Sequence, residues 1–147
     1  MEQYHRAFEE LFVTNIGHRP GERIVVFSDL IRSDEAVSEA DRDRRSRLHA
    51  TALALTKFAR TRHGSADFVD FLSTRASGVE PPLALWSAVL GDALVGQLES
   101  AGLIVPLLEK TIDAIGLERA RAIVTAGKEA VANIVIALSN NSTSHTN

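Results

Sequence analysis

The residues that could do chemistry in this chain follow two apolar runs. Ser28 and Asp29 come directly after residues 24–27, and Ser139 and Asn140 come directly after residues 134–138. If both runs are parallel strands, their carboxyl ends meet at one edge of a sheet, where α/β proteins bind ligands. We therefore take Ser28, Asp29, Ser139 and Asn140 as candidate ligand-binding residues. A purely structural role for Asp29 stays open, because an Asp in this position often caps a loop.

Motifs of metal, nucleophile and nucleotide sites are absent from the sequence. The histidines are His5, His18, His49, His63 and His145. None belongs to a two-histidine metal motif. His5 and Glu9 lie one helical turn apart, but a stable site needs three or four ligands, so we interpret them as a solvated pair. Neither Ser28 nor Ser139 lies in a G-x-S-x-G sequence, and no glycine-rich phosphate loop follows the first strand. We expect no catalytic residue, no metal and no cofactor.

Composition points to one globular domain over residues 1–147. Hydrophobic residues make up 45% and charged residues 24%, and the chain contains no cysteine, which excludes disulfides and thiolate chemistry. The formal net charge of -3 argues against nucleic acid as a partner. No apolar run approaches the roughly 20 residues of a membrane span. The opening residues lack the pattern of a secretory signal, so we expect a cytoplasmic location.

Apolar periodicity predicts a β-α-β unit in the first half of the chain. An amphipathic helix is expected over residues 4–16, and a strand buried on both faces over residues 23–30. A long helix should begin after Ser38, which with Asp41 resembles a capping box, and end near His63. A second strand is expected over residues 66–73. Residues 42–47 carry charges of both signs, so we interpret them as a solvated helix face, with phosphate binding as the alternative.

The second half predicts a helical insert and a last strand. Several short helices with glycine stops are expected over about 81–127, including one capped by Asp92 and one running from Pro106 to Gly116. A third buried strand is expected over residues 133–139, followed by a polar, mobile tail over residues 141–147. The fold class is therefore α/β, a three-layer sandwich with a small parallel sheet of the Rossmann or flavodoxin type.

Three passages resemble the amino-terminal domain of the thermophilic metallo-aminopeptidase family, the aminopeptidase T and S type. Residues 18–26 (HRPGERIVV) are similar to its K-P-G-E turn into the first strand, although His18 and Arg19 replace Val-Lys. Residues 78–86 (GVEPPLALW) are similar to a G-x-E-P-P segment with a following Trp. Residues 132–138 (ANIVIAL) and 142–146 (STSHT) are similar to an A-D-V-V-I strand and an S-x-S-H-T segment. Their order and spacing match across nearly the whole chain.

The resemblance implies a non-catalytic part of a peptidase. In the family, a further domain supplies the Glu, His and Asp ligands of a paired metal site, and no residue here matches those ligands. The chain is then either a truncated piece whose catalytic domain is missing or a stand-alone domain, contributing assembly or substrate access. The first alternative is an independent module that binds a small ligand at the strand ends. The second is an enzyme of unknown type that uses Asp29 and His145.

The expected sheet also predicts a homodimer or larger assembly. A sheet of three strands has two edges, and unpaired edges are normally blunted by charges, Pro or a covering element. Residues 133–138 contain no charge or Pro, and residues 68–72 contain only Asp70, so we expect one of these two runs to be an edge. The insert carries more apolar residues than one helix face usually buries, namely Leu83, Leu85, Trp86, Val89 and Leu90. In the resembling family this domain assembles as a dimer, so a second copy is the expected partner.

Overall fold

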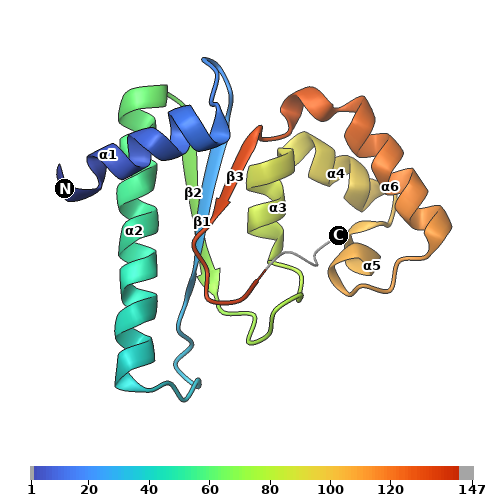
Figure 1. Cartoon of the computed structure of the whole chain (residues 1–147). Coiled ribbons are helices and arrows are strands. Elements are labelled where there is room, and N and C mark those ends of the chain that lie inside the picture. Colours follow the sequence, from blue (N-terminus) through green and yellow to red (C-terminus); the bar gives the residue numbers. More distant parts are fainter. Residues whose placement is uncertain (1, 143–147) are drawn as a thin grey trace.

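The computed structural model describes residues 2–142 and shows helices on both sides of a small sheet (Figure 1). Its elements are α1 Glu2–Glu10, the π-helical segment η1 Leu11–Ile16, β1 Ile24–Leu30, α2 Glu39–His63, β2 Ala66–Leu72, α3 Leu83–Leu90, α4 Asp92–Ser100, α5 Ile104–Leu108, α6 Ala114–Ala126, the 3-10 segment η2 Lys128–Ala130 and β3 Ile134–Ala137. All three expected strands are present with slightly shorter bounds. Within residues 2–142, no helix is both long and apolar enough to cross a membrane.

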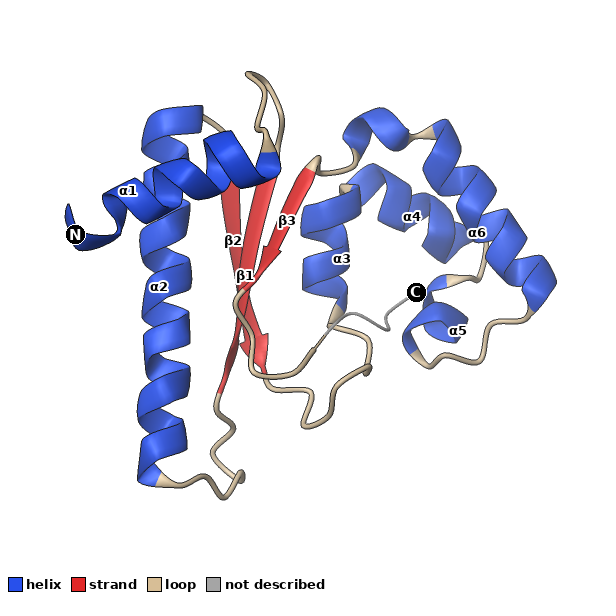
Figure 2. Ribbon diagram, viewed as in Figure 1, coloured by secondary structure: helices blue, strands red, loops and turns tan. Residues whose placement is uncertain are grey.

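The strands form one parallel sheet in the order β2-β1-β3. Ile24 of β1 lies opposite Ala66 of β2 and Ile134 of β3, so the strands start together at one end of the sheet. Residues 24–29 of β1 are buried, since this strand has a neighbour on each side and helices on both faces (Figure 2). The expected α/β class with a small parallel sheet is confirmed.

Strand β3 is an edge strand, so the expectation that it is fully buried is wrong. Its residues alternate between shielded and exposed, and Val135 is 45% exposed. The amide of Leu138 donates to the carbonyl of Phe27 in β1. Because alternate residues of a strand point their amides to opposite sides, those of Val135 and Ala137 point away from β1. An apolar run marks a hydrophobic strand but does not reveal which of its sides the fold covers.

Helices α1 and α2 and the segment η1 cover one face of the sheet. Phe12 of η1, Leu55 and Phe58 of α2, and Ile24 and Val26 of β1 belong to one core cluster. The predicted start of α2 is confirmed, because the Ser38 hydroxyl accepts a hydrogen bond from the Asp41 amide at 3.1 Å. The long helix therefore runs beside the sheet with its boundaries set by local sequence (Figure 1).

Helix α3 covers the opposite face, and α4, α5 and α6 lie beyond it (Figure 2). Leu85 of α3 packs against Val25 and Phe27 of β1. The outer helices have a separate core that includes Leu98 and Leu107. The insert is therefore a small helical layer with its own interior, attached to the sheet through α3.

Two boundaries of the helical insert differ from those expected. Asp92 is the first residue of α4 and provides no side-chain cap. Instead of one helix from Pro106 to Gly116, α5 ends at Leu108, and Asp113 caps α6 by accepting a hydrogen bond from the Gly116 amide at 2.7 Å. The carboxylate cap decides this boundary, because it satisfies an amide that a helix start leaves unpaired. Gly116 therefore lies inside the first turn of α6 rather than ending a helix.

Candidate functional site

Asp29 and Asn140 meet at the carboxyl ends of β1 and β3. The backbone N–H of Asn140 donates to Asp29 Oδ1 at 2.7 Å, and the Asp29 side chain is 4% exposed. The chain places β2 on one side of β1 and β3 on the other, so this boundary is where the strand order reverses. The sequence correctly predicted that these two residues lie together. Asp29 Oδ1, however, already accepts a hydrogen bond from the backbone of the chain.

Ser28 and Ser139 also direct their hydroxyl groups to the protein. Ser28 Oγ donates to the carbonyl of Leu138 at 2.8 Å, and Ser139 Oγ donates to the carbonyl of Asn141 at 2.9 Å. Ser28 is fully buried. Both hydroxyl groups therefore donate to carbonyls of the segment after β3. The four candidate residues link two strand ends to each other and do not form an open site.

The segment after β3 continues across to the end of β2. Asn141 Nδ2 donates to the Ser73 hydroxyl at 2.9 Å, and the Ser142 amide donates to the Ser77 hydroxyl at 3.0 Å. The Gly78 amide donates back to the Ser142 carbonyl at 2.9 Å. The expectation of a mobile tail from residue 141 is thus wrong for the first two residues, because their polar groups have partners. Residues 143–147, including His145, lie outside the described residues.

Arg45 is the buried residue that sequence reasoning assigned to solvent. Its side chain is 2% exposed, and its Nη1 donates to Glu35 Oε1. This hydrogen bond from Arg45 is the main cause that lowers the pKa of the Glu35 carboxyl. The interpretation of residues 42–47 as a solvated face is wrong for only one of their five charged residues, Arg45, because its side chain turns inward to Asp29 and Glu35. The sequence around Arg45 contains no pattern that predicts its contacts with Asp29 and Glu35.

A surface depression of about 380 Å³ lies where Asp29 and Arg45 meet, and we call it the Asp29 depression. Its lining consists of Asp29, Leu30, Ile31, Arg45, Ser46, His49 and Leu72. Four buried polar atoms of the residues that line it have no hydrogen bond to any other described residue, namely Asp29 Oδ2, Arg45 Nε, Arg45 Nη2 and His49 Nδ1. Ser28, Ser139 and Asn140 do not line it. The depression therefore opens on the β2 and α2 side of Asp29, whereas the sequence had indicated the β3 side.

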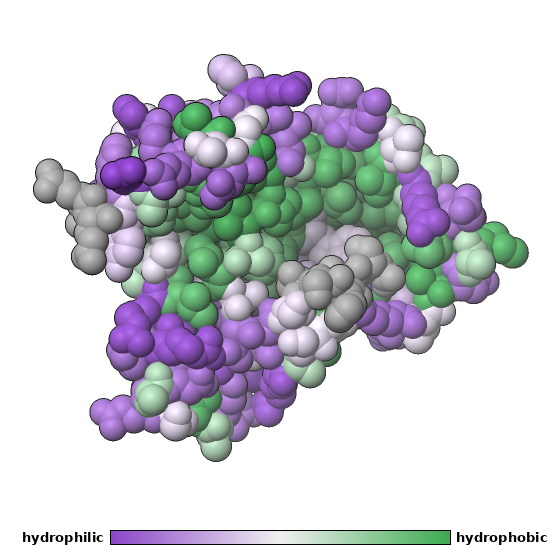
Figure 3. Space-filling model, in the orientation of Figure 1, coloured by the Kyte–Doolittle hydropathy of each residue, from purple (hydrophilic) through white to green (hydrophobic). Residues whose placement is uncertain are grey.

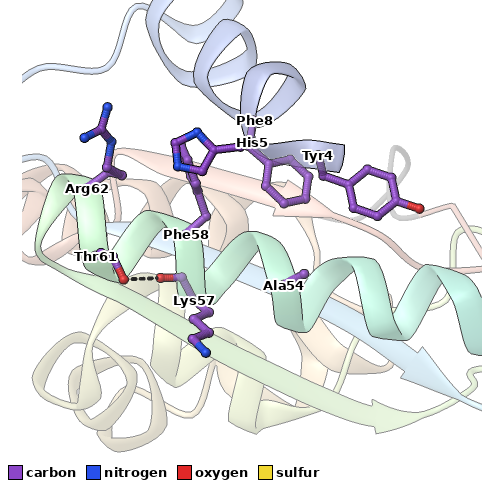
Figure 4. Close-up of a pocket in the computed structure, with 8 residues that line it drawn as sticks. All are labelled: Tyr4, His5, Phe8, Ala54, Lys57, Phe58, Thr61 and Arg62. Atoms are coloured by element: carbon purple, nitrogen blue, oxygen red, sulfur yellow. Dashed lines mark hydrogen bonds between the residues drawn. The ribbon is translucent and has the colours of Figure 1, made fainter. Parts of the chain in front are cut away.

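A smaller hollow of about 180 Å³ lies between α1 and α2 (Figure 4). The His5 ring stands edge-on to Phe58, with centroids 4.9 Å apart. Glu9, with which His5 was expected to form a solvated pair, lies 3.5 Å from Arg62 in an ion pair. The Thr61 hydroxyl donates to the Lys57 carbonyl within α2. Aromatic surface dominates this hollow, and its polar groups do not converge on one point.

Two further histidines pack against each other near the end of α2. The His18 and His63 rings have centroids 4.4 Å apart, and His63 also contacts Phe12. Burial is the main cause that lowers the pKa of His63, with His18 adding to it. Among residues 2–142, no group of three or more His, Asp or Glu side chains could hold a metal ion. The histidine pair therefore belongs to the packing of α1, η1 and α2.

Comparison of the chain with protein-family models, with curated proteins and with solved structures finds no match. The resemblance to the aminopeptidase family thus rests on its three sequence passages. In the structure, the first passage leads into β1, the second leads into α3, and the third includes β3. The second and third passages meet where Gly78 donates to Ser142.

Proposed function

We propose that this chain is a non-catalytic, aminopeptidase-related domain that acts by assembly. The observation that carries the proposal is the open edge of β3. Val135 and Ala137 are both exposed there, and their backbone groups point away from β1. The three resembling passages support the relation to the peptidase family. Action in the cytoplasm belongs to the same proposal.

The surface around β3 is apolar over a wide area. Figure 3 shows hydrophobic residues gathered from the region of β3 across α3 toward α4 and α6. Beside α3, a hollow of about 490 Å³ is lined mainly by apolar side chains, including Trp86, Leu90 and Val124. Contiguous apolar surface of this kind marks interfaces, because its burial removes it from water.

The proposed occupant of this edge is a second copy of the chain. β3 carries no charge, so two copies meet without like-charge repulsion. Two identical edge strands related by a two-fold axis pair antiparallel, and each supplies the amides and carbonyls that the other lacks. A lysine in the strand would prevent this pairing, as it does in natural edge strands.

Light scattering coupled to gel filtration tests the proposal. The unmodified chain should have a mass near twice 15.9 kDa at micromolar concentration. Val135→Lys should shift the mass to that of the monomer, because it places a charge in the middle of the edge. Val105→Lys is the matched control, since Val105 is 60% exposed on α5 and should leave the dimer intact. A monomeric unmodified chain, or equal effects of both variants, would overturn the proposal.

The non-catalytic part of the proposal has a separate test. Purified protein supplied with zinc or cobalt should release no chromogenic leaving group from a leucine substrate, because a catalytic metal needs about three protein ligands. Metal-dependent activity that persists after repurification would overturn it.

A second candidate function is binding of a small ligand at the strand ends. The specific observation in its favour is the cluster of buried polar atoms without hydrogen bonds at the Asp29 depression. Ligand sites typically combine an apolar lining with a few convergent polar groups, and this depression has both.

A further inference from the structure

We propose that the Asp29 depression binds a small, uncharged compound with two adjacent hydroxyl groups, such as a sugar or the ribose of a nucleoside. The proposal rests on the second candidate function and names its ligand class. It is independent of assembly through β3, because the depression lies between β1, β2 and α2.

The Arg45 guanidinium has a buried edge without hydrogen-bond partners among residues 2–142. Nη1 donates to Glu35, while Nε and Nη2 make no hydrogen bond within the part of the chain that the structure describes. These two nitrogens lie on the same edge of the planar group and present two parallel N–H donors. Leaving buried donors without acceptors is unfavourable. The guanidinium is therefore built to receive two oxygen atoms side by side.

A gap lies between the Arg45 guanidinium and the Asp29 carboxylate. Asp29 Oδ2 lies 3.9 Å from Arg45 Nη2, which is beyond the roughly 2.7–3.2 Å of a hydrogen bond. Asp29 Oδ2 itself accepts no hydrogen bond from residues 2–142. An oxygen placed beside both atoms could accept from Arg45 while its own hydrogen is donated to Asp29. A hydroxyl group does both, because it is a donor and an acceptor.

Charge also favours hydroxyl groups. Asp29, Glu35 and Arg45 together carry a formal charge of -1; nearby, Arg44 is paired with Asp41, and Arg32 shares Asp34 with Arg75. A carboxylate or phosphate would also offer two oxygens to Arg45, but it would bring a further negative charge beside Asp29 and provide no hydrogen. Two adjacent hydroxyls provide the oxygens without the charge.

The other side chains that line the depression also suit a sugar or ribose. Leu30, Ile31 and Leu72 present apolar surface that suits the C–H faces of a sugar ring. His49 Nδ1 is a further buried atom without a partner on the same wall, while its Nε2 lies 3.8 Å from Asp70. A third hydroxyl could pair with His49 Nδ1, because a hydroxyl can either donate or accept a hydrogen bond.

Chemical-shift titration of the full chain tests this proposal with D-glucose, adenosine and 2′-deoxyadenosine as probes. Glucose or adenosine should cause saturable shifts at the amides of Asp29, Leu30, Arg45, Ser46, His49 and Leu72. Saturation by glucose would identify a free sugar, and saturation by adenosine alone would identify a nucleoside. If adenosine binds, 2′-deoxyadenosine should bind at least about tenfold more weakly, because it lacks one of the two adjacent ribose hydroxyls.

Variants separate binding from folding. Ser46→Trp fills the mouth of the depression from an exposed position of α2 and should weaken probe binding at least about tenfold without unfolding the chain. Arg47→Trp, also exposed on α2 but outside the lining, is the matched control and should bind normally. The absence of saturable shifts with every probe would show that water alone fills the gap and would overturn the proposal. Equal probe binding by Ser46→Trp and Arg47→Trp would also overturn the proposal. A monomeric mass with normal probe binding would instead overturn only the assembly proposal.

Discussion

The backbone N–H of Asn140 donates to Asp29 Oδ1 at 2.7 Å, and this bond ties the end of the edge strand β3 to the end of the central strand β1. The other carboxylate oxygen faces Arg45 across 3.9 Å. Asp29 thus has two tasks, since Oδ1 closes the sheet on one side and Oδ2 balances a buried cation on the other.

Replacing Asp29 by Asn should therefore destabilise the chain by about 1–3 kcal/mol, because Arg45 loses a buried negative neighbour. Denaturant unfolding measures the change in the free energy of unfolding. Asp43→Asn is the control, because the Asp43–Arg47 pair is exposed and such pairs contribute about 0–1 kcal/mol. Equal stability of both variants would show that the charge of Asp29 has no role in the fold.

Arg23 should anchor the helical insert to the sheet. Its guanidinium donates to the carbonyls of Ala88 at 2.7 Å, Val89 at 3.1 Å and Ala130 at 2.6 Å. Arg23→Lys keeps the charge but not the planar fork, so we expect a loss of about 1–3 kcal/mol. Hydrogen exchange should become faster at the Ala132 amide, which is bonded to Val89. Unchanged exchange at Ala132 would contradict this anchoring role.

Two glycines of the insert provide a matched pair of substitutions. A Cβ atom at Gly127 would lie 2.4 Å from Leu94 Cδ2, whereas one at Gly96 in α4 meets nothing within 4 Å. Gly127→Ala should cost about 1–3 kcal/mol through overpacking. Gly96→Ala should instead stabilise the helix by about 0.5–1 kcal/mol, since Gly is a poor helix former. Thermal unfolding of both variants checks the contrast, and a stabilised Gly127→Ala would refute the packing of α4 against residue 127.

The fold could be predicted from the sequence where local signals were strong. The buried run of β1, the Ser38 cap and the stop at Gly64 each fix one boundary by their own chemistry. Arg45 could not be predicted, because its burial depends on Asp29 and Glu35, which come from other elements. The exposure of β3 depends on which strand lies beside it. Topology determines that neighbour, and apolar spacing does not.

The His63 side chain should make stability depend on pH. Burial holds its pKa below the usual 6.5, with His18 adding to the shift and Glu9 opposing it. The unfolded chain therefore binds a proton at a higher pH than the folded chain does. The stability that neutral His63 contributes should be fully present above about pH 6.5, and it should fall as the pH decreases below that value.

The measurement for His63 is urea unfolding across that range of pH. His63→Gln should flatten the decline in stability below pH 6.5, because the side chain no longer titrates. His5→Gln is the control, since the His5 side chain is exposed although it borders the hollow between α1 and α2. If the decline keeps its slope in the His63 variant, another group causes it.

Hydrogen exchange at the Val135 and Ala137 amides tests the assembly through β3 most directly. These amides point away from β1, so in the monomer they exchange with water freely. In the proposed dimer they are bonded to the second copy. Exchange at both amides should be slow at concentrations where the mass is that of a dimer and fast after dilution to the monomer. Fast exchange at both concentrations, with a dimeric mass at the higher one, would contradict the claim that β3 forms the interface.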